Sequence, residues 1–461
     1  MEKDFLIIGA GLTGLTTAFA LKQKGFSVAV LEKNDYVGGQ IRTLAERGFL
    51  FESGPNTGVI SSIEVSDLFD ELQPDCEVEF AKPEAESRRI WKDGKFHPLP
   101  NGLWGGITTP LFTFSDKFRI LGEPFRAKGT NPDESVASLA ARRLGKSFVD
   151  YAVNPFLSGI YAGDPNMLIT RHALPKLYNL EQNYGSFIGG SIAKAKEKKA
   201  ALKNGEKTFK KGIFSIKSGL SRLPEALAKR IGSENVFLSV NGISILPKDE
   251  NHSWITIFAE NGEKKTLQSQ HVVFTVGAYA LPDLMPFIDE AIMRKITNIR
   301  YAPIVQAAVG IDDRDRLDFK AFGGLVSSKD GEDVLGILFP SACFDGRAPE
   351  KGALFSFFMG GIQRPDIFDR DDAQLENIVV REFHRMLKFP AAKNPDFIRL
   401  FRHKHAIPQY EISTDERLEA VSIAESRFSG LHILGNLRDG IGMANRMEQG
   451  LRFAEKMIRQ I

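Results

Sequence analysis

The residues best placed to do chemistry stand near the N-terminus, where three glycines follow a short apolar run. Residues 9–14 read Gly9-Ala10-Gly11-Leu12-Thr13-Gly14. This spacing suits a turn that holds the pyrophosphate of a dinucleotide, because Gly9 allows the tight turn and Gly11 lets the backbone approach the phosphates. Gly14 lets the following helix pack close to the sheet, and free N–H groups at the helix start attract phosphate charge. The alternative interpretation is a glycine-rich turn without a ligand.

An acidic residue follows at the distance that a dinucleotide site requires. Glu32 comes directly after the apolar run 28–31, roughly 20 residues after the turn. Its carboxylate can accept hydrogen bonds from ribose hydroxyls and would repel a 2′-phosphate, and the adjacent Lys33 is assigned to the same site. A strand over 4–8, a helix over 15–24 and a strand over 28–31 are needed to position these residues. The whole pattern predicts a nucleotide-binding α/β unit.

A second glycine pair comes shortly after the acid. Gly38 and Gly39 would let the backbone pass beside an extended cofactor, and Arg42 could face its phosphates. This arrangement resembles the second motif of the large superfamily of FAD-dependent amine oxidases and desaturases, in which the first glycine turn holds the ADP half of FAD. The resemblance implies one non-covalent FAD rather than NAD. A turn at its flavin end is expected from Gly54, Pro55, Asn56 and Thr57.

The middle of the chain resembles the protoporphyrinogen oxidase family in particular. The resemblance is carried between residues 134 and 190 by ESVASLAARRLG, PFLSGIYAGDP, RHALPKLYNLEQNYGS and FIGG. It implies oxidation of a porphyrinogen to a porphyrin late in haem synthesis, with FAD and molecular oxygen. Close relatives take protoporphyrinogen IX, which is the substrate predicted here, or coproporphyrinogen III. Two alternatives are another FAD enzyme, such as an amine oxidase or a carotenoid desaturase, and a flavin-binding protein without catalysis.

The resemblance also assigns residues far along the chain to the cofactor. The backbone of Ile243 would meet the adenine end, where the chain returns to the nucleotide-binding unit. Near the C-terminus a strand ends in Gly435, and Ile441, Gly442 and Met443 precede a helix whose N-terminus approaches the flavin. A positive helix end near the flavin ring stabilises its anionic reduced form.

The same resemblance assigns the substrate site. Arg88 lies in a predicted hairpin over 87–100 and would pair with a propionate, which a guanidinium can bind through two hydrogen bonds. The neighbouring Arg89 is the alternative. Leu325, Leu338 and Phe358 would sandwich the tetrapyrrole, since an apolar slot suits a large flat ring. The alternative for these three residues is plain core packing.

The mechanism that the family implies requires little chemistry from the side chains. Removing six electrons takes three two-electron transfers to FAD, and oxygen accepts the electrons each time to give peroxide. Hydride leaves a bridge carbon and the other hydrogens leave as protons after tautomerisation, so the protein mainly supplies position and a dry slot. We therefore predict no essential side-chain base. Many family members carry a Gly-His pair shortly after IPQY at 407–410, where this chain has Ser413-Thr414.

Length and composition restrict the fold class, the partners and the domain organisation that the chain can have. At 461 residues we expect an α/β protein with three parts. The net charge of +2 argues against a nucleic-acid partner. The two cysteines have no CxxC spacing, so they indicate neither a metal site nor a disulfide framework. Such cysteine usage predicts a reducing compartment. The parts are a discontinuous Rossmann-like FAD-binding domain (1–80, 212–280 and 425–461), a mixed-sheet substrate domain (81–100 and 285–424) and a helical domain (101–211).

Two segments bear on membrane contact. No signal or transit peptide fits the sequence pattern, and no apolar run reaches about 18 residues, so the predicted location is cytoplasmic. The segment 104–128 mixes phenylalanines with basic residues and could lie in a membrane interface, or else cover a core. The segment 194–211 carries eight lysines and two glutamates and is predicted to be a solvated linker, with an anionic membrane as the alternative. The predicted partners are the porphyrinogen, oxygen, the inner face of the cytoplasmic membrane as a peripheral contact, and a downstream chelatase.

Overall fold

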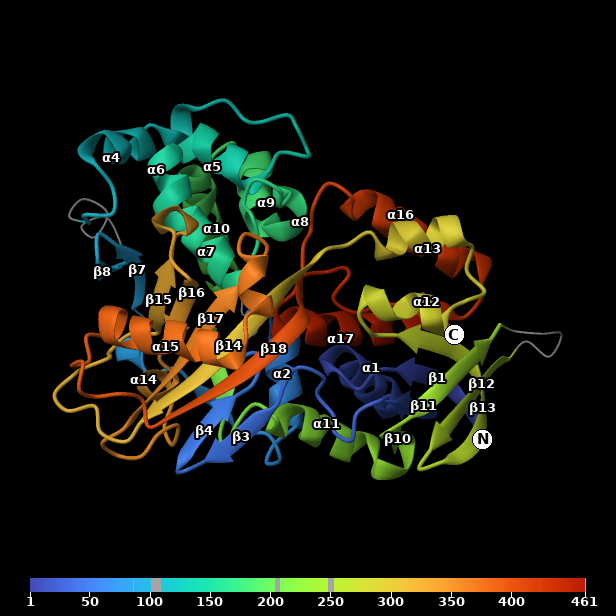
Figure 1. Ribbon diagram of the computed structural model, residues 1–461. Coiled ribbons are helices and arrows are strands. Elements are labelled where there is room, and N and C mark those ends of the chain that lie inside the picture. Colours follow the sequence, from blue (N-terminus) through green and yellow to red (C-terminus); the bar gives the residue numbers. More distant parts are fainter. Residues whose placement is uncertain (86, 101–108, 204–207, 248–252, 461) are drawn as a thin grey trace.

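Two seven-stranded sheets, each assembled from distant parts of the chain, form the framework of the protein (Figure 1). The computed structural model describes residues 1–85, 87–100, 109–203, 208–247 and 253–460. A group of helices lies at one end of the second sheet (Figure 1). The predicted α/β class, with a discontinuous Rossmann-like unit and a mixed-sheet unit, is confirmed.

The first sheet is built around the buried strand β1 (Glu2–Ile8), which pairs in parallel with β2 and β13. Nearly continuous apolar runs, such as Phe5 to Ile8, are typical of parallel strands that are covered on both faces. The strand order is β10-β2-β1-β13-β12-β11, and β19 pairs with β13. The other strands are β2 (Val28–Leu31), β10 (Val236–Phe237), β11 (Asn241–Leu246), β12 (Trp254–Glu260), β13 (Glu263–Phe274) and β19 (Leu431–Ile433).

Helices cover both faces of the first sheet. On one face α1 (Leu12–Gln23) and α17 (Met443–Gln460) cross so closely that a Cβ on Gly450 would lie 2.8 Å from the Thr17 nitrogen. The same face carries α2 (Ile63–Glu71) and α11 (Arg222–Ile231). The opposite face is covered by α12 (Leu281–Leu284), α13 (Glu290–Thr297) and α16 (Thr414–Arg427).

The second sheet has the strand order β18-β14-β17-β16-β15-β7-β8. One of its faces is packed under α15 (Asp372–Leu387), in a core rich in phenylalanine. The predicted hairpin is present, with Asp93 and Gly94 at positive φ in its turn. The strands are β7 (Arg88–Lys92), β8 (Lys95–Pro98), β14 (Tyr301–Ile311), β15 (Gly323–Val326), β16 (Val334–Leu338), β17 (Ala353–Gly360) and β18 (Phe397–Pro408), and α14 (Pro340–Cys343) follows β16.

Two small sheets connect the larger ones. The ribbon of β3 (Thr43–Glu46) and β4 (Phe49–Glu52) packs against the second sheet, where Phe49 and Phe51 join Ala308 and Leu354 in one cluster. The three-stranded sheet β5-β9-β6 consists of β5 (Gly58–Ile60), β6 (Val78–Phe80) and β9 (Gly212–Ile216).

Some elements pack outside the domain ranges expected from the sequence. Helix α13 and most of α16 fall in the range 285–424, yet Met293, Ile296 and Ala420 lie in the core of the first sheet. Strand β4 falls in the range 1–80 but packs on the second sheet. The reason is that apolar helix and ribbon faces follow the nearest uncovered sheet face, which the linear sequence does not reveal. The domain boundaries themselves stay a prediction.

The segment 109–203 forms the helical group at the upper left of Figure 1. Its last helix corrects one expectation, because α10 continues to Lys203 through much of the segment predicted to be a linker. Residues 104–108 and 204–207 of the two basic segments lie outside the described residues. The helices are α4 (Phe114–Leu121), α5 (Val136–Leu144), α6 (Lys146–Phe148), α7 (Asn154–Ile160), α8 (Thr170–Ala173), α9 (Pro175–Tyr184) and α10 (Phe187–Lys203), with a π-helical turn over Val149–Val153.

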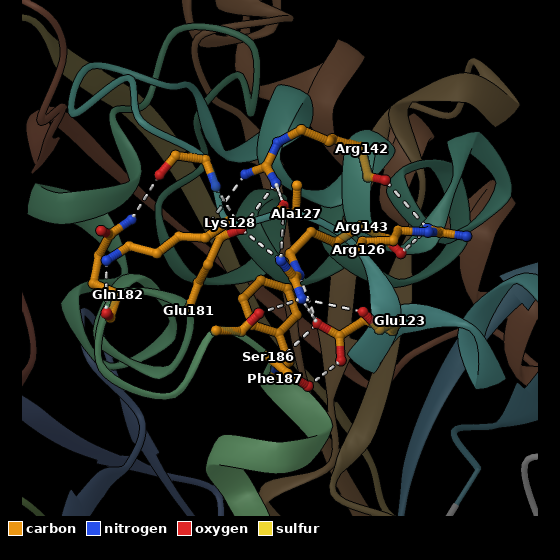
Figure 2. Close-up of polar contacts among 12 residues, drawn as sticks. Glu123, Arg126, Ala127, Lys128, Arg142, Arg143, Glu181, Gln182, Ser186 and Phe187 are labelled. Atoms are coloured by element: carbon orange, nitrogen blue, oxygen red, sulfur yellow. Dashed lines mark hydrogen bonds and ion pairs between the residues drawn. The ribbon is translucent and has the colours of Figure 1, made fainter.

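A buried ion network ties this helical group together (Figure 2). The Arg143 guanidinium, on α5, lies 2.5 Å from the Glu123 carboxylate and 2.6 Å from the Glu181 carboxylate, and all three side chains are almost completely buried. Burial alone would raise the pKa of Glu123, but hydrogen bonds from Ser186 and from the N–H groups of Phe187 and Ile188 lower it. The charged carboxylate therefore caps the start of α10 and links it to α5.

Breaking this network should destabilise the protein strongly. We expect Arg143→Met to lower the free energy of unfolding by about 3–5 kcal/mol, because it leaves the buried Glu123 carboxylate without a guanidinium partner and Glu181 with Arg142 alone. Lys146→Met is the matched control, since it removes an exposed partner of Asp150 and should change stability by less than about 0.5 kcal/mol. Urea denaturation at pH 7 measures both. An Arg143→Met protein as stable as the control would show that the network contributes nothing to stability.

Candidate active site

The glycine-rich turn 9–14 lies at the carboxyl end of β1 and leads directly into α1. Gly9 has a φ of +104°, which side chains rarely tolerate, and its N–H donates to the Leu31 carbonyl at 2.8 Å. A Cβ on Gly14 would stand 2.0 Å from the Gly9 carbonyl oxygen, so this close contact requires glycine. A Cβ on Gly11 would meet no protein atom within 4 Å. The backbone at Gly11 therefore faces open space, which fits a pyrophosphate.

The acidic residue is held against this turn. Glu32 is buried, and its Oε2 accepts a hydrogen bond from the Ala10 N–H at 2.8 Å. Its Oε1 accepts from the N–H of Asn34 at 3.0 Å. Oε1 also accepts from the Asn34 side-chain amide at 2.8 Å, so the capacity that remains for a ribose hydroxyl is on Oε2. Of the other residues assigned here, Lys33 is exposed, and Leu12 and Thr13 are buried in the first turn of α1.

The second glycine pair lies beside the first turn. The Gly38 N–H donates to the Ala10 carbonyl at 2.8 Å, and both Gly38 and Gly39 have positive φ. A Cβ on Gly39 would lie 3.6 Å from the Gly11 Cα, so the two backbones approach each other without a side chain between them. Arg42 is exposed, and its guanidinium carbon lies 4.9 Å from the centre of the Tyr36 ring. The two loops together form the cradle expected for an extended dinucleotide.

The C-terminal glycine turn reaches the same edge of the first sheet. A Cβ on Gly435 would lie 3.1 Å from the Val276 carbonyl oxygen, and a Cβ on Gly9 would lie 3.1 Å from the Val276 side chain. Ligands of open α/β sheets bind beyond the carboxyl ends of the strands, which is where both turns lie. Of the residues after this turn, Ile441 packs against the apolar cluster that includes Tyr161 and Tyr410, Gly442 is exposed, and Met443 is buried at the start of α17.

The segment 52–57 bridges the two large sheets. The Gln306 side chain donates to the Glu52 carbonyl at 2.7 Å, and the Ser356 hydroxyl donates to Asn56 Oδ1 at 2.7 Å. A Cβ on Gly54 would stand 2.1 Å from the Gln40 carbonyl oxygen, so the segment also packs against the second glycine loop. Pro55 and Thr57 are half-buried in the same segment. The expected flavin-end turn therefore lies between the nucleotide cradle and the second sheet.

Ile243 lies in β11, beside an irregularity in the pairing with β12. Its side chain packs at the edge of the core that covers the first sheet. The neighbouring Val240 N–H donates to the Glu32 carbonyl at 2.9 Å, which fixes the start of this strand near the acid. The chain thus returns to the nucleotide cradle in the part of the sequence where the resemblance expects it.

The four residues assigned to the substrate share one face of the second sheet. The strand register aligns Arg88, Leu338 and Ser356 in one row, and Leu325 and Phe358 in the next. Residues aligned across neighbouring strands, or two apart along one strand, point to the same face. This face looks toward the segment 52–57, as the contact between Ser356 and Asn56 demonstrates. The four assigned side chains are half-buried, while the opposite face is packed under α15.

The two neighbouring arginines point in opposite directions. Arg88 lies on the face just described, half-buried, with its guanidinium carbon 5.8 Å from the centre of the Phe322 ring. Burial lowers the pKa of Arg88, and no carboxylate of the described residues lies within 4.0 Å of it. Arg89 points to the other face and donates to the Lys320 carbonyl at 3.3 Å. Of the two, only Arg88 is aligned with the apolar residues.

Several contacting residues were missed in the sequence. A Cβ on Gly159 would lie 2.4 Å from the Leu325 side chain, so this glycine lets α7 pack against the face that carries the four assigned residues. Gln306, Ser356 and His403, whose Nε2 lies 2.6 Å from the Ser53 carbonyl oxygen, hold the bridging segment. Only Gly159 had a signal, because it stands inside the GIYAGDP stretch. No group of three or more potential metal ligands occurs in the described part of the chain.

Comparison with known proteins adds independent findings. A family model described as flavin containing amine oxidoreductase matches residues 12–443. Protoporphyrinogen oxidase 1 of Arabidopsis thaliana chloroplasts is 30% identical, with 96% of this chain and 86% of the relative covered. Coproporphyrinogen III oxidase of Bacillus subtilis (strain 168) is 24% identical, with 97% of this chain and 96% of the relative covered.

Solved structures share the fold along the whole chain. A provisionally named protoporphyrinogen oxidase from Exiguobacterium sp. 255-15 superposes with a TM-score of 0.79 at 18% identity, covering 100% of this chain and 99% of the other. Reduced UDP-galactopyranose mutase superposes with a TM-score of 0.74 at 16% identity, covering 100% and 96%. At these identities the similarity concerns the fold alone.

Proposed function

The chain belongs to the flavin-containing amine oxidoreductase family, in its porphyrinogen oxidase branch, and we propose that it oxidises protoporphyrinogen IX to protoporphyrin IX in haem biosynthesis. It is an FAD-dependent oxidase. The observation that carries the substrate proposal is the shared face of Arg88, Leu325, Leu338 and Phe358, which looks toward the flavin-end segment. The relatives that match nearly the whole chain are named for the same chemistry.

FAD bound in the glycine cradle supplies the two-electron oxidation, and molecular oxygen is the proposed final acceptor. The chain's own residues bind and orient the substrate. Leu325, Leu338 and Phe358 offer apolar side chains to a flat macrocycle and exclude water from it. Arg88 pairs with a propionate and thereby fixes the ring's rotation in the slot. A chelatase that takes up the porphyrin is the proposed downstream partner.

Coproporphyrinogen III is a second candidate substrate because one full-length relative is named for it. It carries two more propionates than protoporphyrinogen IX. Of the four residues assigned to the substrate, only Arg88 is charged, which favours the substrate with fewer carboxylates.

Direct assay of the purified protein tests the function. We expect a yellow protein that converts protoporphyrinogen IX to fluorescent porphyrin in air, with a higher kcat/KM than for coproporphyrinogen III. Fluorescence assays with both substrates, run side by side, measure the ratio. A ratio below one would reassign the substrate, and a yellow but inert protein would indicate flavin binding without this catalysis.

Substitution of Arg88 tests its pairing with the propionate. Loss of a charge-assisted hydrogen-bonded pair costs about 1.5–3 kcal/mol, so Arg88→Ala should raise the KM for protoporphyrinogen IX roughly 10- to 100-fold. Arg89→Ala is the matched control, because Arg89 points to the other face and should leave KM within about twofold. An unchanged KM in Arg88→Ala would remove this assignment.

We also propose that the protein makes a peripheral contact with a membrane. The described residues contain no helix that is long and apolar enough to span a membrane. Helix α4 nevertheless exposes Phe114, Phe118 and Leu121 on one side, with Phe125 following at 91% exposure. Lys117 and Arg119 lie on the same helix. Exposed aromatic side chains beside basic ones are typical of a segment that lies in the headgroup region of an anionic bilayer.

Vesicle sedimentation tests this contact. We expect Phe118→Ser combined with Phe125→Ser to reduce binding to vesicles with anionic lipid at least tenfold, because two exposed apolar anchors are lost. Ile412→Ser is the control, since Ile412 is similarly exposed but lies away from α4, just before α16. Equal sedimentation of the double variant and the control would exclude α4 as the contact.

A further inference from the structure

The loop 435–442, between β19 and α17, has its backbone held by side chains from outside the loop. The Tyr410 hydroxyl lies 2.9 Å from the carbonyl oxygens of both Asn436 and Gly440. Gln449 accepts a hydrogen bond from the Gly435 N–H at 2.9 Å. Two further carbonyls of the loop are bound by buried guanidinium groups.

These guanidiniums belong to Arg417 and Arg446. Arg417 Nε donates to the Leu437 carbonyl at 3.2 Å, and Arg446 Nη2 donates to the Arg438 carbonyl at 2.8 Å. Arg417 is fully buried and Arg446 is 9% exposed. Each guanidinium thus approaches the loop from the protein interior rather than from solvent.

Neither buried guanidinium has a carboxylate partner. No carboxylate of the described residues lies within 4.0 Å of Arg417 or Arg446. The carboxylate of Asp439, which acts on Arg446 from further away, is bound by Arg438 and Gln449. Glu411 and Asp415 act on Arg417 from further away, and they are bound by Arg300 and Arg171 respectively. Burial lowers the pKa of both arginines, but a guanidinium remains charged throughout the range in which proteins are stable.

Two buried positive charges without a carboxylate in contact are costly to the folded protein. Hydrogen bonds to the loop carbonyls offset part of this cost, and a nearby negative charge would offset more. The loop borders the nucleotide cradle, because Gly435 and Gly9 both pack against Val276. When a hydride is transferred to oxidised FAD, a C–H bond of the substrate breaks, an N–H bond forms on the flavin, and the ring gains one negative charge.

We propose that Arg417 and Arg446 are positioning residues that fix the loop 435–442 and supply a positive field favouring reduced over oxidised FAD. This inference rests on the proposed function, in that it requires FAD in the cradle. Charges in a low-dielectric interior act over several ångströms without contact, so the arginines need not touch the flavin. Because each turnover cycle must load electrons onto the same flavin, a higher flavin potential eases every transfer from the substrate.

The midpoint potential of the bound FAD tests this proposal in the absence of substrate. We expect Arg446→Met and Arg417→Met each to reduce the preference for reduced over oxidised FAD at least tenfold, which is about 30 mV for a two-electron couple. Arg446→Lys should retain most of the wild-type potential because it keeps the charge. Arg438→Met is the matched control in the same loop, since Arg438 is half-exposed and lies near Glu425 and Asp439.

Each result of these measurements either supports the role of the two arginines or overturns it. An unchanged potential in both Met variants, or an equal shift in Arg438→Met, would overturn the proposal. Failure of the Met and Lys variants alike to retain FAD would also overturn it, because the arginines would then serve only the folding of the loop. A colourless wild-type protein would instead refute the proposed function, so the two failures are distinguishable.

Discussion

The architecture depends on the meeting of three distant chain segments at the carboxyl ends of β1, β13 and β19. The Thr275 hydroxyl, at the end of β13, lies 2.9 Å from the Ile8 carbonyl oxygen and 3.0 Å from that of Gly9. Gly435 packs against the backbone of the same residue. These approaches leave no room for side chains, so the phosphate turn and the loop before α17 hold a fixed relation to each other. This contact therefore positions the glycine-rich turn and the C-terminal loop relative to each other at the nucleotide cradle.

Local patterns predicted this edge well, since strand, turn, helix and acid are each specified within a few residues. The positive φ of Gly9 and the close approach of Gly14 to it follow from the motif itself. The packing of α13 and α16 on the first sheet could not be predicted, because it depends on which sheet face remains uncovered. The helical continuation of α10 was also missed, since a lysine-rich segment reads equally well as a helix or a linker.

The face proposed to bind the substrate was predicted by resemblance, and the strand register places its four residues on one side of the second sheet. Arg88 and Phe358 are 270 positions apart, yet they point to one side of the sheet. The reason is the pairing register through β15 and β16, which places their two rows on the same face. No sequence period could relate residues across strands that pair in this order. Gly159 was missed for a similar reason, because its role depends on a distant residue: the absence of a side chain at Gly159 allows the Leu325 side chain to approach.

The bridging segment 52–57 has a consequence for how such enzymes diverge. Its carbonyls and amide are held by Gln306, His403 and Ser356, which all belong to the second sheet. The segment 52–57 therefore depends on side chains of the second sheet for its position. A chimera that joined this nucleotide unit to a relative's second sheet would need to carry those three side chains with it, or the segment would lose its register between the sheets.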